Sequence, residues 1–245
     1  MARVISVSNH KGGVGKTTMV ANLGFSLARH FKTLLIDLDP QANLSSGLGF
    51  YDRPENIEKY FKEMVHFRVP EIKPYSINNY VDIIPGNSGL IKIEKQINDS
   101  WRSEMILNEM LSPIKKNYDL IIIDCPPSFN LLTINALRSS NLVLIPAKPE
   151  LFSLYGIEHI REFAEENNIK FKIIFNQVNT RSSLHAKTIS KSKEKFNGNQ
   201  LNHTIRNTVV LAEAFEHAQN IFSHKSMSSG ASDIAGLADE LMPYI

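Results

Sequence analysis

The chain has 245 residues, 42% of them apolar, and a formal net charge of +2. So much apolar content excludes a disordered chain, and the length suits one large α/β domain or two small ones. The single cysteine, Cys125, excludes an internal disulfide, and no apolar run approaches the roughly 20 residues that span a bilayer. The first ten residues also lack the apolar stretch of a signal peptide, so we expect a cytoplasmic protein.

Short apolar runs alternate with longer helical patterns along the chain. Runs rich in Ile, Val and Leu predict strands at residues 3–8, 33–39, 80–86, 118–127, 141–149 and 170–178. Helical spacing of apolar residues predicts helices at residues 17–30, 101–116, 130–139, 153–167 and 182–196. This alternation indicates an α/β fold with a doubly wound, mostly parallel sheet flanked by helices. No repeat or linker interrupts it, so we expect a single domain over residues 1–245, although residues 50–79 show the least clear pattern.

A glycine-rich loop, HKGGVGKTT, follows the first predicted strand and opens the first predicted helix. In this setting backbone N–H groups converge on phosphate oxygens, and the helix N-terminus adds partial positive charge. We expect Lys16 to reach the β- and γ-phosphates and the Thr17 hydroxyl to bind Mg²⁺. The usual spacing would place a glycine at position 10, where this chain has His10, and it adds a second lysine, Lys11.

Three aspartates end predicted strands, at the edge where open α/β sheets bind their ligands. Asp37 and Asp39 share one face of their strand, and Asp124 comes directly before two prolines. Mg²⁺ prefers oxygen ligands and keeps several waters, so we expect Asp124 to hold Mg²⁺ through a water. Asp37 could instead serve the fold rather than a ligand, as a helix cap or through a hydrogen bond in the loop that follows. His10 is a rival catalytic base, with a plain loop residue as the simpler interpretation.

The loop KGGVGKTT resembles the deviant Walker A motif of the ParA/MinD family of ATPases. The resemblance implies a P-loop NTPase that uses ATP and Mg²⁺ and forms an ATP-bound sandwich homodimer. In such a dimer Lys11 contacts the partner's phosphates, while Lys16 serves the nucleotide of its own subunit. The segment DLDPQ is similar to the family's switch I, which implies that Asp39 orients the attacking water near the metal and that Asp37 lies in the metal's outer shell. Hydrolysis is expected to be slow.

Two further segments resemble the same family. Asn176 ends the strand IIFNQV at a position that reads the adenine ring in the family, with a turn-forming asparagine as the alternative. Residues 146–157 resemble a segment of the dimer face. The full set of expected nucleotide-binding residues is Lys11, Gly12, Gly13, Val14, Gly15, Lys16, Thr17, Thr18 and Asn176. The expected metal-binding residues are Thr17, Asp39 and Asp124.

Residues 170–206 carry a local charge of +7, which leaves −5 for the rest of the chain. Such a patch indicates either a polyanionic partner or a solvated helix face. The C-terminal stretch from LAEAFEH onward is similar to that of chromosome- and plasmid-partition ATPases of the ParA family. This implies non-specific DNA binding, a nucleoid-associated location and a ParB-like centromere-binding partner. The residues expected to contact DNA are Lys187, Lys191, Lys193, Lys195 and Arg206.

A MinD-type ATPase that positions a membrane-bound or protein cargo is the alternative function. Residues 228–245 contain Asp233, Asp239 and Glu240 but no lysine or arginine, so anionic lipid would repel this helix and we expect it to pack on the domain. One cysteine excludes the paired cysteines that the nitrogenase iron protein needs for its cluster. No long segment precedes the loop, so a separate operator-binding domain is not expected.

Overall fold

The computed structural model of the chain describes residues 1–98, 100, 102–150, 153–196 and 198–245. The strands are β1 (Arg3–Val7), β2 (Thr33–Asp37), β3 (Tyr75–Ser76), β4 (Val81–Ile84), β5 (Leu120–Asp124), β6 (Leu142–Ala147), β7 (Lys170–Val178) and β8 (Gln200–Arg206). They form one sheet in the order β3-β4-β2-β5-β1-β6-β7-β8. All neighbours run parallel except β3, which is antiparallel to β4. The predicted mostly parallel sheet is confirmed.

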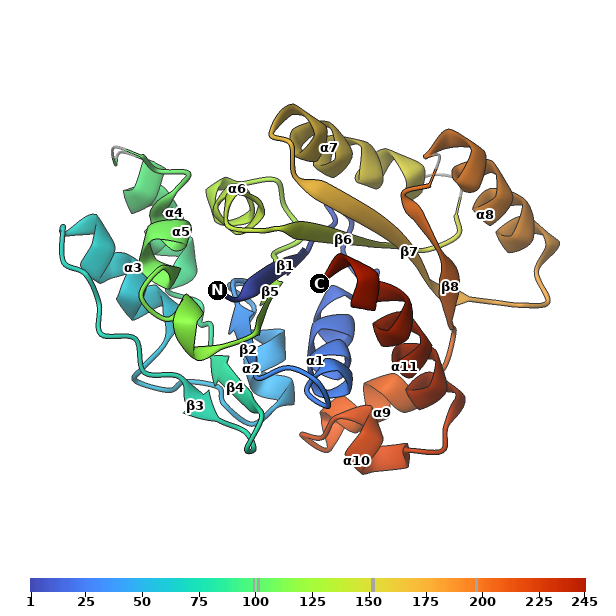
Figure 1. Cartoon of the computed structure of the whole chain (residues 1–245), viewed down its shortest axis with the longest axis horizontal. Coiled ribbons are helices and arrows are strands. Elements are labelled where there is room, and N and C mark those ends of the chain that lie inside the picture. Colours follow the sequence, from blue (N-terminus) through green and yellow to red (C-terminus); the bar gives the residue numbers. More distant parts are fainter. Residues whose placement is uncertain (99, 101, 151–152, 197) are drawn as a thin grey trace.

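Helices cover both faces of this sheet (Figure 1). They are α1 (Lys16–Leu27), α2 (Asn43–Gly47), α3 (Ile57–Val65), α4 (Leu90–Asn98), α5 (Ile106–Leu111), α6 (Leu131–Arg138), α7 (Ser153–Glu166), α8 (Ser183–Lys195), α9 (Val210–Glu216), α10 (Ile221–Lys225) and α11 (Ser229–Leu241), with short 3-10 turns at Lys115–Asn117 and Met242–Tyr244. One apolar core joins α1, α2, α9, α10 and α11 to one face, and two others join α3 to α8 to the opposite face. The central strands are therefore buried on both sides, which explains their nearly continuous apolar sequences.

The predicted helix at residues 101–116 is wrong in extent. Residues 102–105 are a turn, only Ile106–Leu111 is α-helix, and Lys115–Asn117 is a 3-10 turn, while residue 101 lies outside the described residues. Pro113 explains the early stop, because proline lacks the N–H that a longer helix would need. Beyond the predicted elements, the structure also contains α2, α3, α4, β3, β8, α9 and α10.

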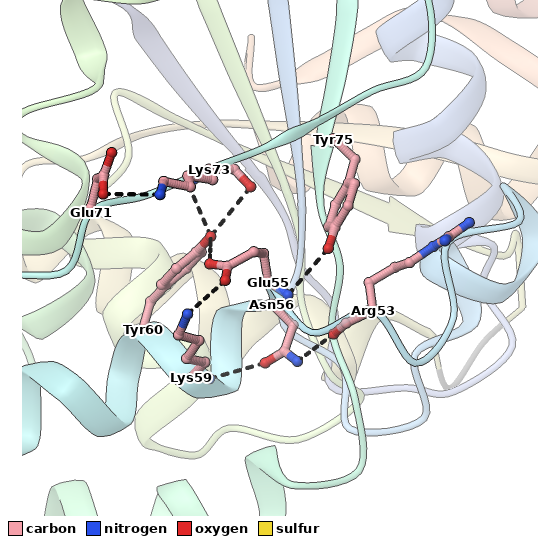
Figure 2. A network of polar contacts seen from close by, with 8 residues as sticks. All are labelled: Arg53, Glu55, Asn56, Lys59, Tyr60, Glu71, Lys73 and Tyr75. Atoms are coloured by element: carbon pink, nitrogen blue, oxygen red, sulfur yellow. Dashed lines mark hydrogen bonds and ion pairs between the residues drawn. The ribbon is translucent and has the colours of Figure 1, made fainter.

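A polar network holds together part of the segment that showed the least clear pattern, residues 50–79 (Figure 2). The Tyr60 hydroxyl accepts a hydrogen bond from the Lys73 backbone N–H (2.9 Å) and lies 3.1 Å from Oε2 of Glu55. Asn56 caps α3, because its Oδ1 accepts from the Lys59 N–H (3.0 Å) while its Nδ2 donates to the Arg53 carbonyl (2.7 Å). These bonds fix an extended loop that has little regular structure of its own.

The C-terminal helix α11 packs on the domain, as expected. Its residues Ile234, Leu237 and Leu241 are buried in the same core as α1. Asp233 on this helix is buried and forms an ion pair with Arg206. Among the described residues, no helix combines the length and apolar character that crossing a membrane requires.

Candidate functional site

The candidate site lies at the carboxyl edge of the sheet, where β1, β2 and β5 end side by side. Asp124 at the end of β5 is in register with Val7 of β1 and with Asp37 of β2. The glycine-rich loop leaves β1 there and enters α1 through Gly15, whose φ of 89° is in the left-handed region that favours glycine. A side chain at Gly15 would also collide with Asn176, since a Cβ would lie 2.2 Å from its Nδ2. The sequence thus brings the loop and three strand ends together.

Lys16 is the first residue of α1, and it is buried. Its ammonium group donates to two carbonyls of its own loop, at Asn9 (3.2 Å) and Lys11 (3.3 Å). Burial lowers the pKa of Lys16, while the nearby charges of Asp124, Cys125 and Asp39 act to raise it. The loop carbonyls therefore hold this cation beside the site, where an arriving phosphate would offer it stronger acceptors.

Asp124 is fully buried, and neither of its carboxylate oxygens has a hydrogen-bond partner among the described residues. Burial raises the pKa of Asp124 well above its usual value, with a further contribution from the charge of Asp37. The Thr17 hydroxyl lies near enough to act against this shift, yet not in the geometry of a normal hydrogen bond. A buried carboxylate without a partner is unfavourable, and a cation would satisfy it. Asp124 and Thr17 therefore fit the predicted Mg²⁺ site.

Asp37 anchors the loop that follows β2. Its Oδ2 accepts from the Ser45 N–H (2.9 Å) and hydroxyl (2.7 Å), and its Oδ1 accepts from the Asp39 N–H (3.1 Å). Burial raises the pKa of Asp37 to about 6, although these hydrogen bonds act against the shift. Both oxygens are thus committed to the protein, so the structure favours the loop hydrogen bond over the predicted position in the metal's outer shell.

Asp39 is differently placed. It lines the cavity in front of the loop, and its Oδ1 accepts from the Gln41 N–H (2.9 Å). Burial raises the pKa of Asp39, opposed by that hydrogen bond and by the charge of Lys16. One carboxylate oxygen remains available to a water or a metal, as the predicted role requires.

The cavity has a volume of about 610 Å³ and is open to solvent on one side. Its predicted lining residues are Gly12, Gly13, Gly15, Lys16, Thr17, Thr18 and Asp39. The cavity is also lined by residues that the sequence pattern did not predict, namely Gln41, Asn43, Ser46, Gly47, Pro127, Ala212, Phe215 and Glu216. Gly47 at the end of α2 lies directly on the Phe215 ring of α9, where a Cβ would be 1.8 Å from Cδ1. This contact joins α2 to α9, and both helices contribute residues to the cavity lining.

Asn176 and Gln177 hold the loop from β7. Nδ2 of Asn176 donates to the Val14 carbonyl (2.8 Å) and its Oδ1 accepts from the Gln177 N–H (2.8 Å). Nε2 of Gln177, a residue with φ of 56°, donates to the Gly13 carbonyl (3.2 Å). Nδ2 and Oδ1 of Asn176 each keep one further hydrogen-bonding position, because an amide has two N–H donors and its oxygen two lone pairs. The adenine contact of Asn176 stays a prediction.

Lys11 does not line the cavity. Its ammonium group pairs with Oε2 of Glu150 at 2.6 Å, in the segment before α7, and both side chains are partly exposed. His10 is exposed, with its ring 6.1 Å from that of His159. The two lysines of the loop therefore point to different places, Lys16 to the cavity and Lys11 to the rim.

The chain is similar to known ATPases over its whole length. A family described as an AAA domain matches residues 2–173. The sporulation initiation inhibitor protein Soj of Bacillus subtilis is 35% identical, with 98% of each chain covered. A putative plasmid partition protein of Borrelia burgdorferi bound to AMPPNP superposes with a TM-score of 0.85 at 22% identity, covering all of both chains. The septum site-determining protein MinD of Pyrococcus horikoshii, complexed with Mg-ADP, gives 0.81 at 26% identity, covering 99% of this chain and 96% of that one.

The chromosome partitioning protein ParA of Myxococcus xanthus is 31% identical, with 99% of this chain and 88% of that protein covered. This chain belongs to the ParA family of ATPases. The P-loop fold expected from the loop motif is thereby confirmed, since its neighbours share the sheet and the flanking helices. The expected cofactors, ATP and Mg²⁺, are of the same kind as the nucleotides and the metal named for those two neighbours.

The basic residues that the ParA resemblance suggested for DNA contact are not equivalent in the structure. Lys187 and Lys191 are exposed on α8 and form no ion pair with any residue that the structure describes. Lys193 donates to Oδ1 of Asn202 (2.8 Å), and Lys195 pairs with Glu158. Arg206 makes a two-pronged ion pair with Asp233 (2.7 and 2.9 Å), which compensates much of its charge. DNA contact by these residues stays a prediction, best supported for Lys187 and Lys191.

Part of the predicted dimer segment, residues 146–157, falls outside the described structure at positions 151 and 152. The described part places Glu150 against Lys11, and Gly156 against Asn9, where a Cβ would lie 2.7 Å from Oδ1. The segment thus borders the loop, as a dimer face near the nucleotide requires. No sequence signal marked Glu150 as the partner of Lys11.

Proposed function

We propose that this protein is a partition-type ATPase, which binds ATP and Mg²⁺, dimerises, binds DNA without sequence specificity and is released when a ParB-like partner stimulates hydrolysis. The observation that carries the proposal is that the side chains of the two loop lysines lie in different places. Lys16 lines the cavity, whereas Lys11 lies outside it at the rim. A cation at the rim of one cavity is well placed to meet the nucleotide of a second subunit.

Hydrolysis needs mainly positioning and stabilisation of charge on the phosphoryl oxygens. Lys16 would leave its two loop carbonyls and bind the phosphates beside the N–H groups of the loop. Mg²⁺ held by Thr17 and, through water, by Asp124 would neutralise phosphate charge. Asp39, which has one oxygen without a protein partner in the structure, would orient the attacking water. Lys11 would complete the charge of the partner's site and so make hydrolysis depend on the dimer.

The first test compares alanine substitutions of the two lysines. Lys16→Ala should weaken ATP binding by about 100-fold, because a charge-assisted contact to the phosphates is lost. Lys11→Ala should bind ATP as the wild type does but remain a monomer and lose both hydrolysis and DNA binding. Calorimetry measures the affinity and light scattering measures the mass. A Lys11→Ala protein that dimerises and hydrolyses ATP normally would contradict the proposal.

A mixed dimer tests the trans role directly. Asp39→Ala should bind ATP and dimerise but turn over poorly, because only the water is misplaced. When it is mixed with Lys11→Ala, one of the two sites has an intact Asp39 and receives a lysine from the Asp39→Ala partner. Phosphate release should then recover in part. Two inactive proteins that stay inactive when mixed, although they form the heterodimer, would rule out the exchange.

Sedimentation with ATP and Mg²⁺ separates the proposal from a MinD-type role. We expect the protein to sediment with plasmid DNA and not with anionic liposomes, because the apolar face of α11 is used in the core. The reverse result would favour a membrane-bound positioning ATPase.

A further inference from the structure

A buried hydrogen-bond network connects the end of β2 to α2 and to the chain that follows β4. Asp37 and Ser45 are both fully buried, and the Ser45 hydroxyl donates to Oδ2 of Asp37 (2.7 Å). The same hydroxyl accepts a hydrogen bond from the N–H of Gly86 (2.9 Å), which lies just beyond β4. The Ser45 N–H also donates to Oδ2 of Asp37 (2.9 Å). Ser45 therefore joins three elements, because its hydroxyl acts as donor and acceptor at once.

The backbone at Gly86 packs directly against Asp37. A Cβ at position 86 would lie 2.6 Å from the Asp37 carbonyl oxygen and 3.2 Å from Cγ of its side chain. Such a close approach is possible only because glycine has no side chain. The Asp37 carboxylate is therefore held by its hydrogen bonds to α2 and by the packing of the chain beyond β4.

The chain between Asp39 and Ser45 forms a strained turn. Ala42 has a φ of 52°, in the left-handed region that residues with a side chain rarely adopt. Its N–H donates to the Asp39 carbonyl (2.8 Å). A strained backbone persists only where the surrounding structure holds it. Asp37 holds both ends of this turn, because its Oδ1 accepts from the Asp39 N–H (3.1 Å) and its Oδ2 from Ser45.

The position of the Asp39 carboxylate depends on this turn. Its Oδ1 accepts from the N–H of Gln41, which belongs to the same turn. Within the described residues, no other hydrogen bond to the Asp39 side chain is present, so no separate element fixes its direction. The backbone that Asp37 and Ser45 hold therefore decides where the free oxygen of Asp39 lies in the cavity.

We propose that Ser45 is a positioning residue for ATP hydrolysis and holds Asp39 in place through Asp37, a role that rests on the proposed function. Ser45 is not one of the described residues that line the cavity, so it acts without touching the nucleotide. A catalytic group displaced by about 1 Å can lose about 100-fold in rate. Loss of the Ser45 hydroxyl should therefore slow turnover, while the phosphate-binding loop and its affinity for ATP are left unchanged.

The first test is Ser45→Ala, which removes one hydrogen bond from Asp37 and one from Gly86. We expect kcat for ATP to fall about tenfold or more, whereas the ATP dissociation constant from calorimetry should stay within about twofold. Without nucleotide, hydrogen–deuterium exchange of residues 38–46 should become faster, because the turn is less protected. Gly86→Ala should give the same pattern, since it displaces Asp37 while the Ser45 hydroxyl is kept.

Ser139→Ala is the matched control. The Ser139 hydroxyl is buried at the end of α6 and donates to the Asn135 carbonyl (2.7 Å). This variant also loses a buried hydrogen bond, so its melting temperature should fall as that of Ser45→Ala does. Its turnover and the exchange of residues 38–46 should nevertheless match the wild type, because it leaves Asp37 untouched.

A double variant shows whether Ser45 acts through Asp39. In the Asp39→Ala background, adding Ser45→Ala should not reduce the residual turnover further, because the group that it positions is already absent. A further loss by the same factor as in the wild-type background would overturn the inference. Wild-type kcat in Ser45→Ala would also overturn it, and in both cases the proposed function stands as long as the wild type hydrolyses ATP. A wild type without ATPase activity would overturn both.

Discussion

Two polar regions of this protein, one partly exposed and one buried, are built in opposite ways. Around Tyr60, the hydroxyl, amide and carboxylate groups shown in Figure 2 have hydrogen-bond partners within the chain. Around Asp124, a fully buried carboxylate has none among the described residues, and Lys16 bonds to carbonyls at 3.2 and 3.3 Å. The first arrangement stabilises a loop. The second carries an unfavourable group that an external cation can satisfy, and this difference separates a binding site from a structural network.

Among the substitutions that test this difference, Asp124→Asn should have the largest effect, and that effect should be on ATP hydrolysis. We expect Mg²⁺-dependent hydrolysis to fall by about 100-fold or more, because the metal loses an anionic group that holds its waters. The unfolding free energy of the protein without nucleotide should stay the same or rise, since a buried carboxylate without a partner is removed. A phosphate-release assay and denaturant unfolding provide the two readouts. A strongly destabilised Asp124→Asn protein would show that this carboxylate serves the fold.

Replacing Tyr60 with phenylalanine should give the opposite pattern. The substitution leaves the Lys73 N–H without its acceptor, so the unfolding free energy should fall by about 1–3 kcal/mol. Hydrolysis of ATP should be unchanged, because α3 is not part of the cavity wall. Tyr51→Phe is the matched control, since this tyrosine is 56% exposed and should tolerate the same change. If Tyr60→Phe and Tyr51→Phe have equal free energies of unfolding, the hydrogen bonds of Tyr60 do not stabilise this loop.

Replacing Glu55 with glutamine should have the smallest effect. Glu55 pairs with Lys59 one helical turn away at 2.6 Å, and both side chains are partly exposed. Exposed pairs of this kind contribute little, so destabilisation should be smaller than for Tyr60→Phe and should disappear in 1 M salt. Unfolding curves at two salt concentrations measure this. A salt-independent loss would mean that the hydrogen bond from Tyr60 is the larger contribution of Glu55.

The sequence predicted the central strands well because they are buried on both faces. The run LIIID of β5 leaves little room for another interpretation. In contrast, β8 (QLNHTIR) is an edge strand with half-exposed polar residues, and its pairing with β7 is irregular. Its pattern does not distinguish a strand from a loop. The helix α3 did carry a signal, since Asn56 is an N-cap and Ile57, Tyr60 and Phe61 have helical spacing, but the surrounding polar residues obscured it.

The candidate site divides in the same way. The loop and its aspartates could be predicted, because a local motif fixes their spacing along the chain. The contacts that decide which of these residues can bind a ligand could not be predicted, because they join residues far apart in the sequence. Ser45 donates two hydrogen bonds to one oxygen of Asp37, Asn176 donates to the Val14 carbonyl in the loop, and Glu150 pairs with Lys11. Only the folded chain reveals which carboxylate is free for a ligand.

The contact between Gly47 and Phe215 has an evolutionary consequence. A Cβ at position 47 would lie 1.8 Å from the ring, so even alanine is excluded while phenylalanine stays at position 215. A change at either position must therefore follow or accompany a change at the other. In related sequences, a side chain at position 47 should occur together with a smaller residue at position 215. These two positions, one at the end of α2 and one in α9, should thus diverge as a pair.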